Sequence, residues 1–294
     1  MYQVKVIADS LNPLGIRLLT IQARYWRAIH AELMTHRVFS RNASSSRAIP
    51  VEVMLAQVWN DPAGPLHWGV NQPGMQARAE MVGWRRAAAG MLWRGAAKAA
   101  CTFAWSLMKL GAHKQVANRL LEPFQYISVI ISATEWDNFF ELRDHPDAQP
   151  EIQHLARQIK AAVRGSWPQR LSAGQWHLPY ITEADHKTAY KACKEGRITR
   201  DEPRVGEIIN LLIKASVARC ARVSYLTHDG QSPSLKKDIA LHDKLVVAKP
   251  IHASPAEHQA MARNDGEFLR NFRGWSQYRV EVEAAETLEA EEAY

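Results

Sequence analysis

Cysteine is scarce in this sequence, and the spacings that would give it a structural or metal-binding role are missing. The chain of 294 residues has three cysteines, Cys101, Cys193 and Cys220, with no CxxC pair. An odd and scattered set offers no disulfide framework and favours a reducing compartment, so we expect a cytoplasmic protein without a metal site. The chain also has no run of 18 apolar residues and no signal-peptide pattern, which argues against a membrane span or secretion.

Recognised nucleic-acid-binding signatures are missing as well. No helix-turn-helix, zinc-finger or RNP pattern is present. Lys and Arg nevertheless number 37 against 30 Asp and Glu, for a net charge of +7. This excess suits an anionic ligand, either a nucleotide or a nucleic acid. The Arg- and Trp-rich segment 84–105 keeps a nucleic-acid-binding protein as an alternative, but we predict no specific nucleic acid partner.

Hydrophobic patterning predicts a mixture of strands and helices, as in an α+β or an α/β fold. Alternation predicts strands at 2–8 and 17–23. Apolar residues spaced three and four positions apart predict helices at 26–37, 76–122, 136–142, 152–163 and 205–217. Residues 48–75 are rich in Pro, Gly and Asn and are predicted to be loop. We interpret 165–203 as a possible insertion and expect the acidic tail 281–294 to fray.

Residues 35–47, THRVFSRNASSSR, combine three arginines, one histidine and four serines with little to pack. Glu32 and His36 are four residues apart and share a face at the end of the preceding helix. Arginine forks bind phosphates and carboxylates, and small hydroxyl residues let backbone N–H groups approach an anion. Composition alone leaves a solvated loop and an anion-binding loop both open.

Two further arginines stand at the polar edges of helical segments. Arg119 lies in ANRLLEP and Arg143 in FFELRDHPDAQPEIQ. Taken singly, each is typical of a surface arginine. Taken with THRVFSRNASSSR, they form a set whose spacing resembles that of a known enzyme family.

The family that this set resembles is the flavin-dependent thymidylate synthases, or ThyX enzymes. THRVFSRNASSSR is similar to the family's R-H-R-x7-S signature, and ANRLLEP to its A-R-x-x-L-P segment. NFFELRDHPDAQPEIQ is similar to its N-F-x-x-L-R-x-x-x-x-A-Q-x-E-I-Q segment. The departures are Thr35 for the signature's first arginine, Ala43 for a glutamate, Glu32 for a glutamine and Asp147 for a histidine. They lie around the substrate and leave the pyrimidine and its product open.

The order of the motifs is rotated relative to the family. CARVSY and IHASPAEH resemble the family's A-R-V-S and H-x-T-P-x-E-H segments, which normally precede the signature. Here they follow residue 217. We infer a circular permutation that carries the family's N-terminal part at this chain's C-terminus, a change that folds tolerate when termini are close.

The resemblance implies a role for each matched residue. It implies flavin contacts from Thr35, His36, Arg37, Asn138, Ser224, Ser254 and Glu257. It implies nucleotide contacts from Glu32, Ser45, Ser46, Arg47 and Arg119. Catalysis falls to Arg143, which would stabilise negative charge on the uracil N3 and O2. His252 is placed at the folate or active-site edge, although a purely structural histidine remains open.

The fold and function implied are those of the family. We expect one ThyX-like catalytic domain over 1–280, with an antiparallel sheet flanked by helices and permuted N-terminal elements. It would methylate dUMP to dTMP with FAD, NADPH and 5,10-methylenetetrahydrofolate, as a homotetramer. No cysteine lies in the arginine-rich segments, so a cysteine nucleophile has no support. A flavin-dependent deoxypyrimidine hydroxymethylase and an inactive homologue are the alternatives.

Overall fold

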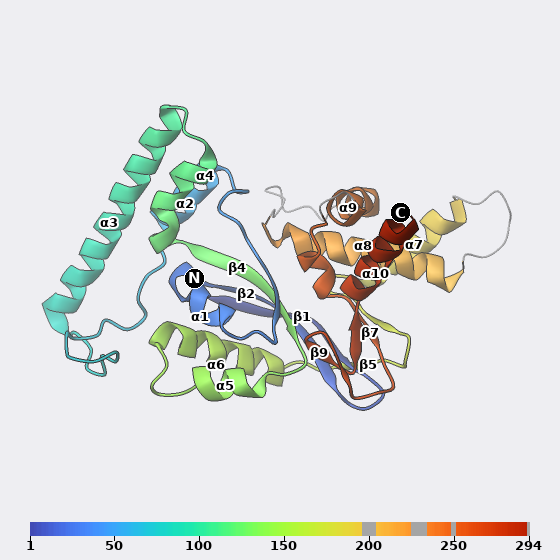
Figure 1. The fold of residues 1–294 in the computed structure, drawn as a ribbon. Helices are drawn as coiled ribbons and strands as arrows, with labels where there is room; N and C mark the ends of the chain where they lie inside the picture. Colours follow the sequence, from blue (N-terminus) through green and yellow to red (C-terminus); the bar gives the residue numbers. More distant parts are fainter. Residues whose placement is uncertain (196–203, 225–233, 248–250, 293–294) are drawn as a thin grey trace.

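The computed structural model describes residues 1–195, 204–224, 234–247 and 251–292, which form an α+β fold around one main sheet (Figure 1). The sheet has five strands in the order β3-β4-β2-β1-β5. They are β1 (Gln3–Leu11), β2 (Arg17–Trp26), β3 (Ser40–Ala43), β4 (Tyr126–Ala133) and β5 (Gln169–Arg170). The pairs β1–β2, β2–β4 and β3–β4 are antiparallel, and β5 joins β1 in parallel. The predicted α+β fold with a mainly antiparallel sheet is confirmed.

The hairpin of β1 and β2 follows from local chemistry. Both strands were predicted from alternation, and both are present. Between them, Oδ1 of Asn12 accepts hydrogen bonds from the backbone N–H groups of Leu14 (3.0 Å) and Ile16 (2.8 Å). Gly15 takes a φ of 77°, which glycine adopts without steric cost. This turn fixes the register of the two strands.

Two helices cover one face of the sheet, below it in Figure 1. They are α5 (Asp137–Arg143) and α6 (Pro150–Arg164), close to the bounds that the spacing predicts. Ile152, Leu155 and Ile159 share one stripe of α6 and are fully buried in the core cluster with β2 and β4. Each such side chain contributes about 1.5–3 kcal/mol when buried. The stripe therefore fixes α6, and α5 with it, against the strands.

Helix α8 (Val205–Ala221) covers the opposite face, where Cys220 and Val223 pack against Ile130 of β4. Around it lie α7 (Glu183–Glu195), η3 (Arg222–Ser224), α9 (Leu235–His242), η4 (Asp243–Val247), η5 (Ser254–Glu257) and α10 (Tyr278–Glu292). A smaller sheet has the order β10-β7-β6, with β6 (Trp176–His177), β7 (Ala260–Ala262) and β10 (Trp275–Gln277). Strands β8 (Phe268–Leu269) and β9 (Phe272–Arg273) form a separate pair.

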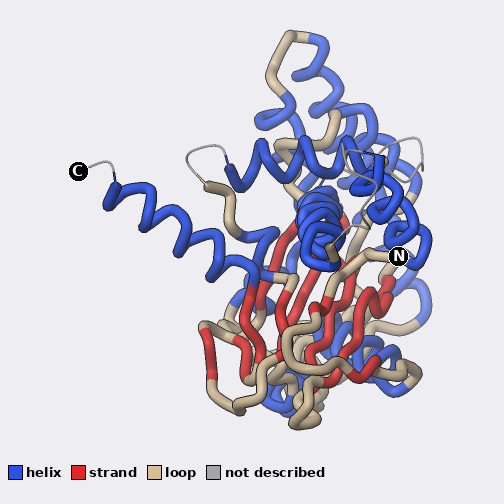
Figure 2. The backbone as a smooth tube through the Cα atoms, turned by 90° about the vertical axis from the view of Figure 1, so that its right-hand side faces the viewer, coloured by secondary structure: helices blue, strands red, loops and turns tan. Residues whose placement is uncertain are grey.

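Two segments interpreted from the sequence as peripheral contribute regular elements. The described part of 165–203 supplies β5 to the main sheet, β6 to the smaller one, and α7. The acidic tail belongs to α10 as far as Glu292. Figure 2 shows this helix leading away from the sheet toward the C-terminus.

A helical unit that lies beyond the end of β2 and the start of β4 differs from the prediction. The stretch 48–75 was predicted as loop, and this is wrong for α2 (Val51–Asn60). Val51, Met54 and Val58 form a buried stripe between the prolines that dominated the composition. The predicted helix 76–122 is instead α3 (Gly83–Lys109), α4 (Lys114–Ala117) and η2 (Asn118–Phe124), and 26–37 holds η1 (Arg27–Ile29) and α1 (His30–Met34). Gly111, at φ 87°, ends α3.

The longest helix of the described ranges, α3, lacks the apolar length that a membrane crossing requires, and so do the others described.

Candidate functional site

Arg143 joins three other predicted site residues into one group. It is the last residue of α5 and reaches the loop that follows α1. Its Nε donates to Nε2 of His36 (3.0 Å), its Nη1 to Oε2 of Glu32 (3.0 Å) and its Nη2 to Oγ1 of Thr35 (3.1 Å). The side chain is 19% exposed. We name Glu32, Thr35, His36 and Arg143 the Arg143 cluster.

His36 is held neutral within this cluster. Its ring is buried, edge-on to Phe139 with 5.0 Å between centroids. Burial, and then the charges of Arg143 and Arg41, lower the pKa of His36 to about 4. Because Nε2 accepts from Arg143, the ring proton lies on Nδ1. At neutral pH His36 is therefore an uncharged ring with a fixed tautomer.

Arg41 supports the same loop and was not among the predicted site residues. Its Nη1 donates to the carbonyl oxygens of Leu33 (3.3 Å), Met34 (2.9 Å) and His36 (3.2 Å). These carbonyls belong to the end of α1 and the turn after it, where those of Leu33 and His36 also accept from the backbone N–H groups of His36 and Phe39. Burial lowers the pKa of Arg41, and the nearby Glu257 opposes that shift. Its position within THRVFSRNASSSR could have marked Arg41 as a site residue. Its role, however, depends on the folded loop, which brings three backbone carbonyls to its guanidinium.

A second group forms around Glu122, another residue that the sequence interpretation missed. Its Oε1 accepts from Oγ of Ser46 (3.0 Å) and Nη1 of Arg119 (2.7 Å), and lies 3.1 Å from Nη2 of Arg27. Nδ2 of Asn118 donates to the Ser46 carbonyl (2.7 Å) and fixes the loop. We name Ser46, Arg119, Glu122 and Arg27 the Glu122 cluster. It unites two of the predicted nucleotide contacts.

The remaining predicted nucleotide contacts adjoin the Glu122 cluster. Oγ of Ser45 accepts from the backbone N–H of Arg47 (3.3 Å), and the Arg47 side chain is exposed. Arg119 is 53% exposed. Both guanidinium groups therefore face solvent beside a serine-rich loop, an arrangement that can hold a phosphate.

The two clusters lie at opposite ends of β3. This strand pairs with β4 from Ser40↔Ser132 to Ala43↔Val129. The Arg143 cluster precedes β3 and the Glu122 cluster follows it. Four residues of strand span about 13 Å. Within the described ranges, no hydrogen bond or ion pair joins the clusters directly.

The two C-terminal segments fold back onto β3 in the same chain. Nδ2 of Asn42 donates to the carbonyl of Cys220, the first residue of CARVSY (2.8 Å). Nε2 of Gln277 donates both to Oγ of Ser40 (2.9 Å) and to the carbonyl of Glu257 in IHASPAEH (3.0 Å). Segments far apart in the sequence thus meet at the signature loop.

The other predicted flavin-side residues differ in how they are held. The Glu257 carboxylate pairs with Arg279. Arg37, Asn138 and Ser254 are exposed, and the described contacts give these three side chains no internal hydrogen-bond partner. His252 is exposed, and its backbone N–H donates to the Leu245 carbonyl (2.8 Å). Ser224 ends η3, and its side chain lies outside the described part of the chain.

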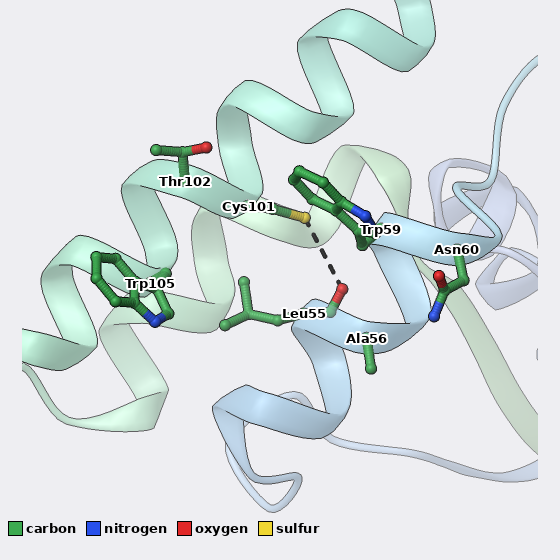
Figure 3. Close-up of a pocket in the computed structure, with 7 residues that line it drawn as sticks. All are labelled: Leu55, Ala56, Trp59, Asn60, Cys101, Thr102 and Trp105. Carbon is green, nitrogen blue, oxygen red and sulfur yellow. Dashed lines mark hydrogen bonds between the residues drawn. The ribbon is translucent and has the colours of Figure 1, made fainter.

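A pocket between α2 and α3 is built from other residues (Figure 3). Its volume is about 330 Å³, and its lining includes Leu55, Trp59, Cys101 and Trp105. Sγ of Cys101 lies 3.9 Å from the Leu55 carbonyl, and burial raises the pKa of that thiol. None of the predicted site residues lines this pocket. It is an apolar surface feature separate from both clusters.

The comparisons with known proteins agree with the motifs. The family model described as thymidylate synthase complementing protein matches residues 14–169, which is more than half of the chain and includes both clusters. The chain belongs to this family and is an enzyme of the thymidylate synthase-like type. The matched range ends before CARVSY and IHASPAEH.

Solved structures with a similar fold were also found, whereas no curated protein matches. One is the UMP/dUMP methylase PolB from Streptomyces cacaoi bound with 5-Br UMP, 17% identical with a TM-score of 0.48, over 56% of this chain and 90% of that chain. The same protein bound with 5-Br dUMP is 16% identical, with a TM-score of 0.47 and the same coverage.

Proposed function

We propose that this chain methylates dUMP to dTMP, with FAD, NADPH and 5,10-methylenetetrahydrofolate. The observation that carries the proposal is the Arg143 cluster. It joins the signature loop to the NFFELR helix inside the range that matches the family. The two segments are far apart in the sequence, and both match motifs of the family, so their meeting supports a functional role.

Two of the three cysteines argue for a route without a covalent cysteine intermediate. Cys101 and Cys220 are buried, and burial raises the pKa of both thiols. A thiol that stays protonated is a poor nucleophile. A cofactor that carries the electrons fits these residues better.

The donors near β3 fit an anionic flavin. Arg37, Asn138 and Ser254 are exposed and have no internal partner in the described contacts, so their hydrogen-bonding capacity is available to a ligand. Together with Thr35, His36 and Glu257 they would hold FAD, with Ser224 as a further contact. Bound FAD would supply the reducing electrons, and NADPH would renew them. The neutral ring of His36 adds no charge beside the flavin.

Arg143 would act on the pyrimidine from a preorganised position. Its guanidinium is already oriented by Glu32, Thr35 and His36, so little reorganisation accompanies charge development on the uracil N3 and O2. Glu32 places a carboxylate in this cluster, where it would contact the nucleotide. His252 would lie at the folate edge.

The phosphate would lie at the Glu122 cluster. Ser45, Ser46, Arg47 and Arg119 offer hydroxyls and two exposed forks at one loop. Because Glu122 already accepts from Arg119, a phosphate there would compete with that carboxylate for the Arg119 guanidinium or share the guanidinium with it.

A homotetramer would reconcile the two clusters. They lie at opposite ends of β3, so a site that needs both can form between subunits. Helix α3 supplies apolar surface for such contacts: Trp84 is 77% exposed, Leu92 76% and Phe103 66%.

A flavin-dependent hydroxymethylase is the second candidate, favoured by the departures around the substrate. Thr35 replaces an arginine at the centre of the Arg143 cluster, and Glu32 adds a negative charge there. Both changes can alter which pyrimidine the site binds and which one-carbon group it leaves on the product.

The test is FAD titration followed by product analysis with dUMP and dCMP as separate substrates. We expect saturable FAD binding and a methylated product from dUMP. A hydroxymethylated product would favour the second candidate. Absence of saturable FAD binding would refute both, and Arg157→Ala, on the exposed side of α6, is the matched control for arginine variants.

A further inference from the structure

Five buried polar side chains form one hydrogen-bonded chain across the sheet face that α8 covers. Oγ of Ser10 lies 2.8 Å from Nδ1 of His177, whose Nε2 lies 2.8 Å from Oγ1 of Thr20. Thr20 Oγ1 is 2.6 Å from Oγ of Ser132, which is 2.9 Å from Nδ1 of His258. All five residues are at most 4% exposed. We name them the buried polar chain.

The buried polar chain connects parts of the protein that are distant in sequence. Ser10 belongs to β1, Thr20 to β2, Ser132 to β4 and His177 to β6, whereas His258 directly follows η5. Polar groups in such a core are costly unless every link is made. Burial lowers the pKa of both histidines to about 3, so both rings are neutral near pH 7.

The hydrogen bonds of the buried polar chain can all donate toward His258 or all donate away from it, and the two directions give His258 different tautomers. If Ser132 donates to Nδ1, then Nε2 of His258 carries the proton; if Nδ1 donates, Nε2 is an acceptor. Nε2 is buried and has no partner within the described residues. Because only Nδ1 has a partner among the described residues, the direction of the Ser132 hydrogen bond sets the tautomer of His258.

His258, the last member of the buried polar chain, directly follows η5, the short helix that holds the proposed flavin contacts Ser254 and Glu257. His258 anchors the C-terminal end of η5 to β4 through Ser132, and Gln277 anchors the Glu257 carbonyl to Ser40 of β3. Ser254 begins the same short helix. Two anchors from two strands thus set where η5 stands beside the signature loop.

We propose that the buried polar chain is a positioning device for η5, and that His258 is a positioning residue which sets Ser254 and Glu257 for the flavin. The positioning of η5 stands on the contacts above, whereas the flavin part rests on the proposed function. Thr20, two links from His258, then influences flavin binding without contacting the flavin-side segment.

The test begins with the ligand-free protein. Thr20→Val is nearly isosteric and removes the hydroxyl that links His177 to Ser132, and Thr20→Ser keeps it. Thr188→Val is the matched control, because among the described residues that hydroxyl bonds only the Ala184 carbonyl within α7 (2.8 Å) and is exposed. Hydrogen exchange of residues 251–259 is measured for each. We expect exchange about tenfold faster in Thr20→Val, as one lost buried hydrogen bond implies, and wild-type exchange in the other two.

Ser132→Ala is the second variant, since it breaks the next link without adding volume, and it decides the matter if Thr20→Val does not fold. Wild-type exchange of 251–259 in a folded Thr20→Val or Ser132→Ala would overturn the proposal. Equal acceleration across β1, β2 and 251–259 would also overturn it, because the chain would then stabilise the core without positioning η5.

The FAD dissociation constant is measured on the same variants. We expect it to rise about tenfold in Thr20→Val and to return in Thr20→Ser. If wild-type protein binds no FAD, the proposed function fails, while the exchange experiment still decides whether the buried polar chain positions η5.

Discussion

Replacing Arg143 with alanine perturbs both the stability and the chemistry of the proposed site. The substitution removes hydrogen bonds to Glu32, Thr35 and His36 and leaves the Glu32 carboxylate, 31% exposed, without its partner. A bond that involves a charged group contributes about 1.5–3 kcal/mol, and partial exposure reduces the ion-pair share. We therefore expect the free energy of unfolding to fall by about 2 kcal/mol.

Turnover should fall further than stability. A preorganised donor to a developing oxyanion contributes about 3 kcal/mol, or on the order of a hundredfold in rate. Arg143→Lys should recover little, because a point charge cannot reproduce bonds from Nε, Nη1 and Nη2 to three residues. The rate of the chemical step is thus the more sensitive readout.

The assay combines urea denaturation with single-turnover oxidation of reduced flavin in the presence of nucleotide and folate. Arg157→Ala is the control, because Arg157 is 59% exposed and bonds Asp144, a carboxylate that Lys160 also holds. We expect the control to match wild type in both measurements. If Arg143→Ala also matches wild type in stability and flavin oxidation, Arg143 is an ordinary surface arginine and the reasoning is refuted.

Three further outcomes are expected. Burial lowers the pKa of His258 to about 3 in the folded protein, whereas the unfolded histidine binds a proton below about pH 6.5, so stability falls as pH falls. Between pH 7 and pH 5, the free energy of unfolding measured by urea denaturation should therefore fall by about 2 kcal/mol more in wild type than in His258→Asn. Arg47→Ala and Arg119→Ala should mainly raise KM for the nucleotide in steady-state assays, with kcat nearly kept, because phosphate contacts act equally on ground and transition states. Trp105→Glu, at a position 50% exposed, should shift light-scattering mass toward the monomer; an unchanged mass would place the subunit contact elsewhere.

The regular elements with a clear period could be predicted from the sequence. Strands β1 and β2 alternate, and α6 places Ile152, Leu155 and Ile159 on one stripe. Helix α2 was missed because flanking prolines and glycines dominate the composition of its segment, while Val51 and Met54 carry the helical signal.

Strand β3 could not be predicted from local pattern. Three of its four residues, Ser40–Ala43, are polar, and they are extended because they pair with β4 and because Asn42 bonds the Cys220 carbonyl. Such contacts join residues far apart in the sequence.

Motifs located the candidate site but not its internal partners. Matching the two segments to motifs of one family places Arg143 and His36 in the same site, where the structure shows them in contact. The roles of Arg41 and Glu122 depend on bonds to backbone carbonyls and to Ser46, which spacing does not reveal. The division into two clusters likewise depends on β3 and its length.

The most direct test of the account is the mass of the nucleotide formed from dUMP by the purified protein with FAD, NADPH and 5,10-methylenetetrahydrofolate. The account predicts dTMP, formed in the complete mixture and lost when FAD is omitted from protein stripped of flavin. Unchanged dUMP from protein that has bound FAD, or dTMP formed equally without any flavin, would contradict it.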